Sequence, residues 1–288
     1  MKKIIFLLCW IVLPAALTAQ NTNPAYLLYD VQHKKTISID ELIINLKKTD
    51  VLIFGEEHND SIGHLLETQI FSKLNAAYPP AALSMEMFST DVQPIINEYL
   101  SGLISEKNFV KEARAWNNYT DYRPLVEMAK ASKTEVIGAN AATRYSNAVT
   151  FGGLAVLQQF PAASRSFLPP LPIDTATGRY YEKFTETLGG HDMGNMKIYQ
   201  TQNLWDATMA WSIASFAKSH PGAKIFHING RFHSDEKTGV VAQLKKYAAR
   251  LHVVTISCFP AQDFEAPIWH EKAQLADYII LSKPVIKK

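Results

Sequence analysis

Cysteine and long hydrophobic runs are scarce in this chain of 288 residues. It has two cysteines, Cys9 in an apolar N-terminal stretch and Cys258 in a run of β-branched and apolar residues. Without the N-terminal stretch no intramolecular disulfide can form, so the fold must depend on packing. No later apolar run is longer than the N-terminal one, which falls short of the about 20 residues that a membrane-spanning helix needs. With 47% hydrophobic and 19% charged residues, the chain is also not a disordered or low-complexity protein.

The first 19 residues have the pattern of a secretory signal peptide. A basic start is followed by the continuously apolar residues 4–13, then by Pro14 and a small residue at Ala19. This pattern predicts cleavage after Ala19 and export to the periplasm or the exterior. Large residues precede Cys9, unlike a lipoprotein processing site, so we expect no lipid anchor.

The mature chain, residues 20–288, has no excess of charge of either sign. The full sequence contains 29 Lys and Arg against 27 Asp and Glu, and two of the lysines lie in the signal peptide. Proteins that follow a phosphate backbone normally carry a basic excess or stripe. By its charge, the sequence therefore predicts no nucleic-acid partner.

Short β-branched or apolar runs alternate with amphipathic segments. The expected strands cover residues 51–54, 82–85, 135–139, 224–228, 252–258 and 278–281. Helical spacing of apolar residues predicts helices between Asp60 and Pro79, between Asp91 and Gly102, and over residues 121–131, 199–218 and 239–249. This order predicts an α/β fold with a mainly parallel sheet flanked by helices on both faces.

Residues 152–194 interrupt the alternation, because proline and glycine are too frequent there for a long regular element. We expect an irregular or helical insertion, or a lid, over approximately residues 143–197, at one edge of a single domain that comprises residues 20–288.

Polar residues follow four of the expected strands. They are the segment 55–58, Glu86, Asn140 and the segment 229–233. Because the carboxyl ends of parallel strands meet at one edge of a sheet, where ligands bind in open α/β folds, these groups are predicted to converge.

Four of these side chains, Glu56, His58, Glu86 and His233, form the predicted polar site and are called the quartet below. Glu86 lies among apolar residues and needs a partner, which could be a metal, a quartet histidine or a backbone amide. The quartet could hold a divalent metal, or it could act by acid–base catalysis in which a carboxylate orients an imidazole. The spacing is not that of a His-Glu-x-x-His zinc helix. The structural alternative is acids at helix N-termini and solvated loop histidines.

Other polar side chains have weaker signals. Gln202 and Asp206 lie one helical turn apart and belong either to the same rim or to an exposed flank. His64, on the helix after His58, is expected to support the site or to lie at the surface. His191 lies in the insertion and could swing over a ligand, with a plain loop residue as the alternative.

An ordered set of motifs resembles the ChaN family of haem-binding uptake proteins. This family lies within the broader Tiki group, which also includes erythromycin esterases and metalloproteases. The motifs are Gly55-Glu56-Glu57-His58, Met85-Glu86-Met87-Phe88, Trp116, Tyr119, Tyr122, Asn140, the segment 202–210, Gly230 and His233. They occur in the same order over nearly the whole mature chain.

The resemblance implies an EreA/ChaN-like α/β fold and haem binding linked to iron uptake. The quartet matches the polar motif that the group shares. Tyr119 or Tyr122 is then the expected axial ligand, because a tyrosinate oxygen suits ferric iron. Arg144 could pair with a propionate, and His191 could contact the ligand. Haem or another small molecule, a second copy of the chain around the haem and an outer-membrane haem receptor are the expected partners.

The same group offers an alternative function, a metal-assisted or Glu/His-based hydrolase of the esterase or peptidase type. In that case His58 would be the general base, assisted by Glu56, while Glu86 and His233 would position water or a metal. A non-catalytic interaction domain is a third interpretation, but it leaves the quartet unexplained.

Overall fold

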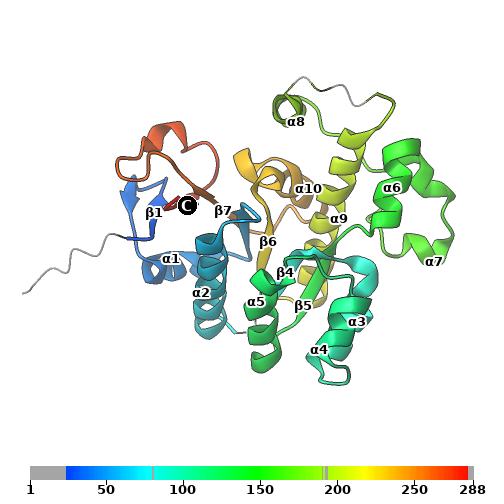
Figure 1. Cartoon of the computed structure of the whole chain (residues 1–288), viewed down its shortest axis with the longest axis horizontal. Coiled ribbons are helices and arrows are strands. Elements are labelled where there is room, and N and C mark those ends of the chain that lie inside the picture. The colour runs from blue at the N-terminus through cyan, green and yellow to red at the C-terminus, as the bar shows by residue number, and fades with distance from the viewer. Residues whose placement is uncertain (1–23, 80, 190, 192–193, 285–288) are drawn as a thin grey trace, which may run out of the picture.

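The computed structural model describes residues 24–79, 81–189, 191 and 194–284. The predicted signal peptide and Cys9 lie outside the described residues. Within them, one sheet has the strand order β2-β1-β8-β7-β3-β6-β4-β5 (Figure 1). The strands are β1 (Tyr26–Asp30), β2 (Lys35–Thr36), β3 (Val51–Glu56), β4 (Ala81–Ser89), β5 (Val136–Asn140), β6 (Lys224–Gly230), β7 (Val253–Pro260) and β8 (Tyr278–Ser282).

The predicted class, an α/β fold with a mainly parallel sheet, is confirmed. Strands β8, β7, β3, β6, β4 and β5 pair in parallel, and each was expected from its β-branched and apolar run. Strand β1 pairs antiparallel with β8 and with β2. This antiparallel edge was not expected. Strand β2 has only two residues, and the apolar run of β1 is short and ends at the charged Asp30, so neither has a clear strand pattern.

Ten α-helices accompany the sheet in the described residues. They are α1 (Ile39–Asn45), α2 (Ser61–Ala77), α3 (Gln93–Leu100), α4 (Glu106–Glu112), α5 (Tyr119–Ser132), α6 (Thr143–Gly152), α7 (Ala162–Arg165), α8 (Arg179–Leu188), α9 (Ile198–Ser219) and α10 (Gly239–Tyr247). The predicted Asp60 cap is present, since its carboxylate accepts a hydrogen bond from the backbone N–H of Ile62 at 3.1 Å.

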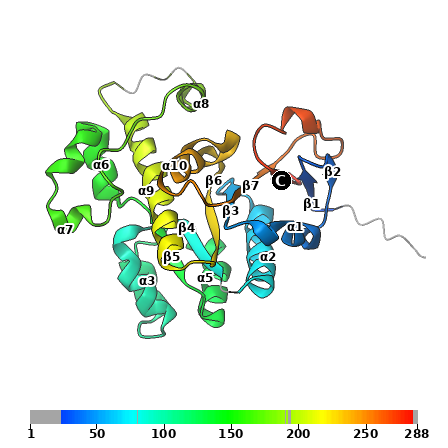
Figure 2. The ribbon, with the colours of Figure 1, turned by 180° about the vertical axis from the view of Figure 1, so that it is seen from behind.

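The two faces of the sheet pack against different helices (Figures 1 and 2). On β3, Leu52 and Phe54 point into the larger core with α2 and α5, while Val51 and Ile53 point into a second core with α9 and α10. Alternate residues of one strand are thus buried on opposite faces, which explains why this strand is apolar at consecutive positions.

The expected insertion, approximately residues 143–197, contains three helices, α6, α7 and α8. Tyr145 and Leu157 of this segment pack on Leu204 of α9 in a separate small core. Helices α6 and α7 lie beyond α9, whereas α8 lies above the ends of the strands (Figure 1). Among the described residues, no helix combines the length and the hydrophobicity that crossing a membrane requires.

Candidate functional site

The strand register brings the loops that carry the quartet together. Glu56, the last residue of β3, is paired with Gly230, the last residue of β6. Met85 on β4 is paired with Ile228 on the other side of β6, which places Glu86 beside the same strand end. Because all three strands are parallel, their carboxyl ends deliver the quartet to one edge of the sheet.

Glu56 and His58 form one carboxylate–imidazole pair. The Glu56 carboxylate is buried, and its Oε1 lies 2.7 Å from His58 Nδ1 and accepts a 2.6 Å hydrogen bond from the Tyr122 hydroxyl. Burial opposes ionisation of Glu56, but the hydrogen bonds from His58 and its other neighbours outweigh it and lower its pKa. The same hydrogen bond raises the pKa of His58, although burial works against it.

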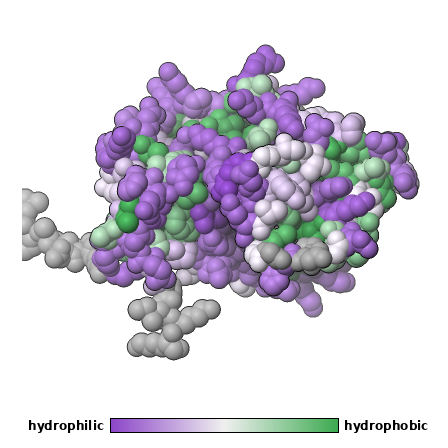
Figure 3. All heavy atoms as spheres, turned by 90° about the horizontal axis from the view of Figure 1, so that it is seen from above, coloured by the Kyte–Doolittle hydropathy of each residue, from purple (hydrophilic) through white to green (hydrophobic). Residues whose placement is uncertain are grey.

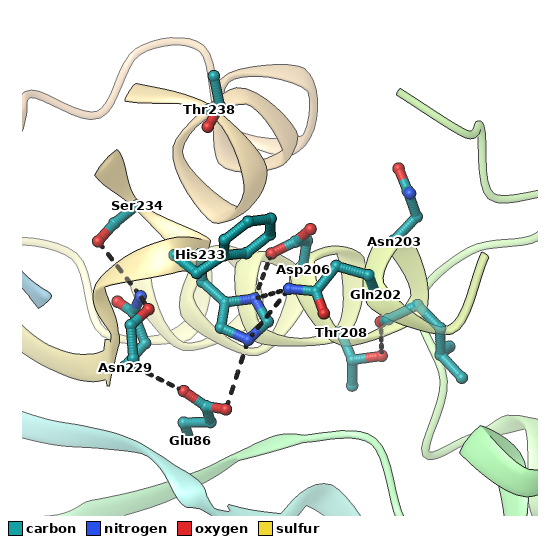
Figure 4. A network of polar contacts seen from close by, with 12 residues as sticks. Glu86, Gln202, Asn203, Asp206, Thr208, Asn229, His233, Ser234 and Thr238 are labelled. Atoms are coloured by element: carbon teal, nitrogen blue, oxygen red, sulfur yellow. Dashed lines mark hydrogen bonds and ion pairs between the residues drawn. The ribbon is translucent and has the colours of Figure 1, made fainter. Parts of the chain in front are cut away.

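His233 forms a second pair of this kind with Asp206 of α9. His233 Nδ1 lies 2.7 Å from Asp206 Oδ1, and its Nε2 lies 3.5 Å from Glu86 Oε1 (Figure 4). Burial would lower the pKa of His233, but the charges of Glu86 and Asp206 raise it. Gln202, one turn before Asp206, places its side-chain nitrogen 3.1 Å from His233 Nδ1. Of the two locations left open for Gln202 and Asp206, the structure places both at the site.

Glu86 lies between the two pairs and has a backbone partner as well as an imidazole. Its Oε2 accepts a 2.7 Å hydrogen bond from the N–H of Gly230, while Oε1 faces His233. Glycine is needed at position 230 for packing, because a Cβ there would lie 2.7 Å from His58 Nε2. The close approach of β6 to His58 therefore depends on the missing side chain.

Helix α8 holds the loop that carries His233. The buried Lys183 ammonium donates to the carbonyl oxygens of Phe232 and Asp235 and to Thr238 Oγ1, at 2.9, 3.0 and 2.9 Å. Tyr180, one turn earlier, donates its hydroxyl to Asp206 Oδ2. The inserted segment thus supplies partners for the His233–Asp206 pair.

Two hollows adjoin the quartet. One, of about 520 Å³, is lined by Glu56, His58 and His233, and the other, of about 340 Å³, by Glu86 with Trp116 and Trp205. A larger hollow of about 770 Å³ lies at the amino-terminal ends of the strands and is lined by no quartet residue, so its size does not identify the site. In the view onto α8 and α10, hydrophilic residues fill the middle of the face and hydrophobic ones form separate patches (Figure 3).

The four residues expected to contact haem lie in different environments. Tyr122 is buried and bound to Glu56, and Tyr119 is buried beside Phe88 and Phe109, so neither hydroxyl is presented at the surface. Arg144 is half exposed and paired with Asp91. His191 is exposed in the insertion. Their roles toward haem stay predictions.

Three residues at or near the site were missed by the sequence analysis: Tyr180, Lys183 and Glu67. Asp206, Gln202 and His64 were left undecided. Glu67 had a detectable signal. It is an acidic residue in the series 64, 67, 71, 74, whose helical spacing marks the buried face of α2. Tyr180 and Lys183 had none, because α8 contacts residues some 50 positions further along the chain.

His64 and Glu67 lie behind Glu56, on the side away from His58. His64 Nε2 is 3.1 Å from Glu56 Oε2, and Glu67 is fully buried. Burial and the nearby charge of Glu56 raise the pKa of Glu67 well above its usual range. Of the two expectations for His64, support of the site or a place at the surface, the structure agrees with the first.

Comparison with solved structures found several similar chains. The chain is similar to a structure described as "Cofacial heme binding to ChaN of Campylobacter jejuni", with 18% identity and a TM-score of 0.68 over 91% of this chain and 98% of that one. It is also similar to the type III effector HopBA1, with 13% identity, a TM-score of 0.48 and coverage of 86% and 94%. For an erythromycin esterase mutant, EreC H289N, the identity is 11%, the TM-score 0.47 and the coverage 90% and 84%.

The family profile covers the part of the chain that carries the quartet. A comparison with curated proteins gave no match. The profile described as haem-binding uptake, Tiki superfamily, ChaN matches residues 42–244, which run from α1 to α10 and include every quartet residue. The chain therefore belongs to the ChaN family of haem-binding uptake proteins in the Tiki superfamily.

Proposed function

We propose that this protein is exported, with cleavage after Ala19, and binds haem as cargo for haem and iron uptake. The observation that carries the proposal is the family match over residues 42–244. It is supported by the likeness in fold to a ChaN for which cofacial haem binding is described. Residues 20–288 would act as a single domain.

The hollow between Trp116 and Trp205 suits an aromatic ligand that carries acids. Trp116 packs edge-on against His58, with ring centroids 5.2 Å apart, and Met87 adds a further apolar contact surface. Arg114, half exposed, lines the same hollow and could pair with a propionate. The donor set therefore fits haem, in which both the flat apolar ring and the anionic groups need partners.

His58 is the quartet member best placed to meet the iron, because 43% of its side chain is exposed. It lines the neighbouring hollow and contacts Trp116, so a haem with its iron on His58 would extend over both hollows. Imidazole is a common axial ligand of haem. Ligation by Tyr119 or Tyr122 would require α5 to move, since both hydroxyls are buried. A second copy of this chain could cover the exposed face of the ring, and an outer-membrane haem receptor is a suitable partner for release.

A hemin titration of residues 20–288, followed by visible absorbance, tests the proposal. We expect a saturable Soret shift that is lost or displaced in His58→Ala and retained in His252→Ala, an exposed histidine elsewhere. Tyr119→Phe and Tyr122→Phe should leave the band unchanged; loss in either one would instead assign the ligand to that tyrosine. Absence of a saturable shift in the unmodified chain would overturn the haem proposal.

Oligomeric state belongs to the same experiment. Light scattering after gel filtration, with and without one equivalent of hemin, should show a dimer when haem is bound. A monomer in both samples would contradict the proposed dimer without affecting the proposed ligand.

A specific observation favours hydrolysis as a second candidate function. Each quartet histidine has its Nδ1 beside a buried carboxylate, at 2.7 Å in both pairs. In His58 this keeps Nε2 for a substrate, water or metal, whereas His233 Nε2 faces Glu86. Glu56 and Asp206 would fix the tautomer, and His58 would take the proton of an attacking water. A divalent metal held by the quartet would supply Lewis-acid activation of that water.

Ester and peptide substrates test this candidate separately. We expect turnover, if the site is hydrolytic, to fall by about 10²-fold or more in Asp206→Asn, because His233 then loses its charged partner. Activity in the unmodified chain that is unchanged in Asp206→Asn would exclude the His233 pair from the reaction.

A further inference from the structure

A second polar group lies behind the quartet, between β3 and α2. It consists of Glu56, His64 and Glu67, all buried, and is called the inner cluster below. One ligand-type atom from each residue lies within 4.8 Å of those of the other two. The inner cluster shares Glu56 with the quartet but uses the other oxygen of its carboxylate.

The two oxygens of Glu56 have different surroundings. Oε1 accepts from Tyr122 and faces His58 Nδ1, so its bonding capacity is used on the side of the hollow. Oε2 has no hydrogen-bond partner within the described residues, although His64 Nε2 is 3.1 Å away without the alignment of a hydrogen bond. Glu56 Oε2 therefore points toward α2, with His64 as an ion-pair neighbour but without an aligned hydrogen bond.

Glu67 is the second and independent observation. Its side chain is fully buried, and in the described part of the chain neither of its carboxylate oxygens has a hydrogen-bond partner. His64 Nε2 is likewise buried and without a hydrogen bond among these residues. Buried polar groups are normally paired, and a carboxylate left alone in the interior costs several kcal/mol. These atoms without hydrogen bonds belong to one imidazole and two carboxylates, and the ligand-type atoms of the three residues lie within 4.8 Å of one another.

We propose that Glu56, His64 and Glu67 bind one divalent transition-metal ion. One imidazole nitrogen and two carboxylate oxygens are a donor set that suits Zn²⁺, Mn²⁺ or Fe²⁺. The neighbours fit a supporting role, since Tyr122 donates to Glu56 and its ring packs edge-on against His64, with centroids 5.0 Å apart. The site is distinct from a metal held by the quartet, which would lie on the other side of Glu56.

A metal ion in the inner cluster would affect His58, because both share Glu56 as a partner. A cation on Oε2 would withdraw electron density from the carboxylate whose Oε1 faces His58 Nδ1. The metal would therefore fix Glu56 in its observed orientation and weaken it as a partner of His58. It would be a structural ion with an effect on the exposed imidazole, and it does not depend on haem binding.

The alternative occupant of this space is a proton shared by Glu56 and Glu67. The Glu67→Gln substitution distinguishes the two, because a glutamine amide can donate a hydrogen bond to Glu56 as a protonated carboxyl would but is a poor metal ligand. Glu67→Gln removes a buried acid without a change in size, so we expect it to fold.

Residues 20–288 should be purified without chelator, analysed for metal content, stripped with a strong chelator and titrated with ZnCl₂ and with MnCl₂. We expect one equivalent of metal and, at about 100 times the dissociation constant, a rise in melting temperature of about 5 °C or more. Both should be lost in Glu67→Gln, while its metal-free form should melt at or above the unmodified metal-free chain.

Glu86→Gln is the matched control, because it removes an acid of the quartet and leaves the inner cluster intact. Retention of the metal in Glu86→Gln and its loss in Glu67→Gln would support the proposal. The opposite pattern would assign the metal to the quartet. If neither ion bound to the unmodified chain, a proton shared by Glu56 and Glu67 would be the occupant of the inner cluster. Each of these two results would overturn the proposal.

Discussion

Two histidines on or next to β6 show how their surroundings set the charge of a residue. His233 lies between Glu86 and Asp206, and their charges raise its pKa against the effect of burial. His227, six residues earlier, is fully buried, and the Ser84 hydroxyl lies 2.9 Å from its Nδ1. Burial, and then the nearby His233, lower the pKa of His227 to about 3.

His227 should make the protein sensitive to acid. In an unfolded chain a histidine has a pKa of about 6.5, so below that pH the unfolded state binds a proton that the folded state does not. The stability from neutral His227 is complete above about pH 6.5 and is lost as the pH falls toward about 3. At the acid end the loss could reach about 5 kcal/mol.

Urea unfolding between pH 7.5 and pH 4 measures this effect. The free energy of unfolding should fall less steeply with decreasing pH in His227→Gln than in the unmodified chain. Equal slopes for the two proteins would show that His227 does not carry the acid sensitivity.

At the scale of elements, α8 is the part that sequence reasoning treated least well. Its ten residues lie in the segment expected to be irregular, yet Lys183 and Tyr180 tie it to the His233 loop and to Asp206. The side-chain contacts that join α8 to the site are with η4 (Arg231–His233), the turn that follows η4 and α9. A local pattern could not indicate them, because most of the stability of a short helix comes from packing.

Removal of the Lys183 ammonium should release α8. Lys183→Met removes a donor from three acceptor oxygens. The Asp235 carbonyl still accepts from Thr238, and each buried acceptor left without any donor costs about 1–3 kcal/mol. We expect cleavage by chymotrypsin at Tyr180, Tyr181 or Phe184 to become about tenfold faster or more. Lys107→Met, at an exposed position of α4, is the control and should be cleaved as slowly as the unmodified chain. Equal rates for both variants would mean that Lys183 does not anchor the helix.

At the scale of the whole molecule, no disulfide stabilises the described fold. Cys258 lies on β7 within the larger core, is fully buried and is a free thiol. Burial raises the pKa of this thiol well above its usual range, which disfavours the reactive thiolate. The described chain therefore has no accessible cysteine for a disulfide between molecules.

A thiol assay on residues 20–288 checks this. With Ellman's reagent the folded protein should remain unlabelled over hours, and one thiol should react at once in guanidinium chloride. Fast labelling without denaturant would show that β7 opens readily, contrary to its central position in the core.

The parallel strands and the quartet could be predicted for the same reason. Residues 51–54 and 224–228 have consecutive apolar positions, which is the pattern of strands buried on both faces, and they became β3 and β6. The polar residues directly after them then had to lie at one edge. The partners of the quartet were harder to predict, because Asp206 looks equally suited to an exposed flank, and Tyr180 and Lys183 lie on a helix whose partners are distant in sequence.

The sequence by itself determined the parallel α/β class, the order of strands and helices, and the edge at which Glu56, His58, Glu86 and His233 meet. These follow from local periodicity and from the direction that parallel strands share. Only the tertiary structure decided which oxygen of Glu56 faces His58 and which faces His64, and that Asp206, Tyr180 and Lys183 support His233. The contacts of Asp206, Tyr180 and Lys183 join segments about 20 to 55 positions apart. The two neighbours of Glu56 lie on opposite sides of its carboxylate. In both cases the packing of side chains in the folded chain selects the contact.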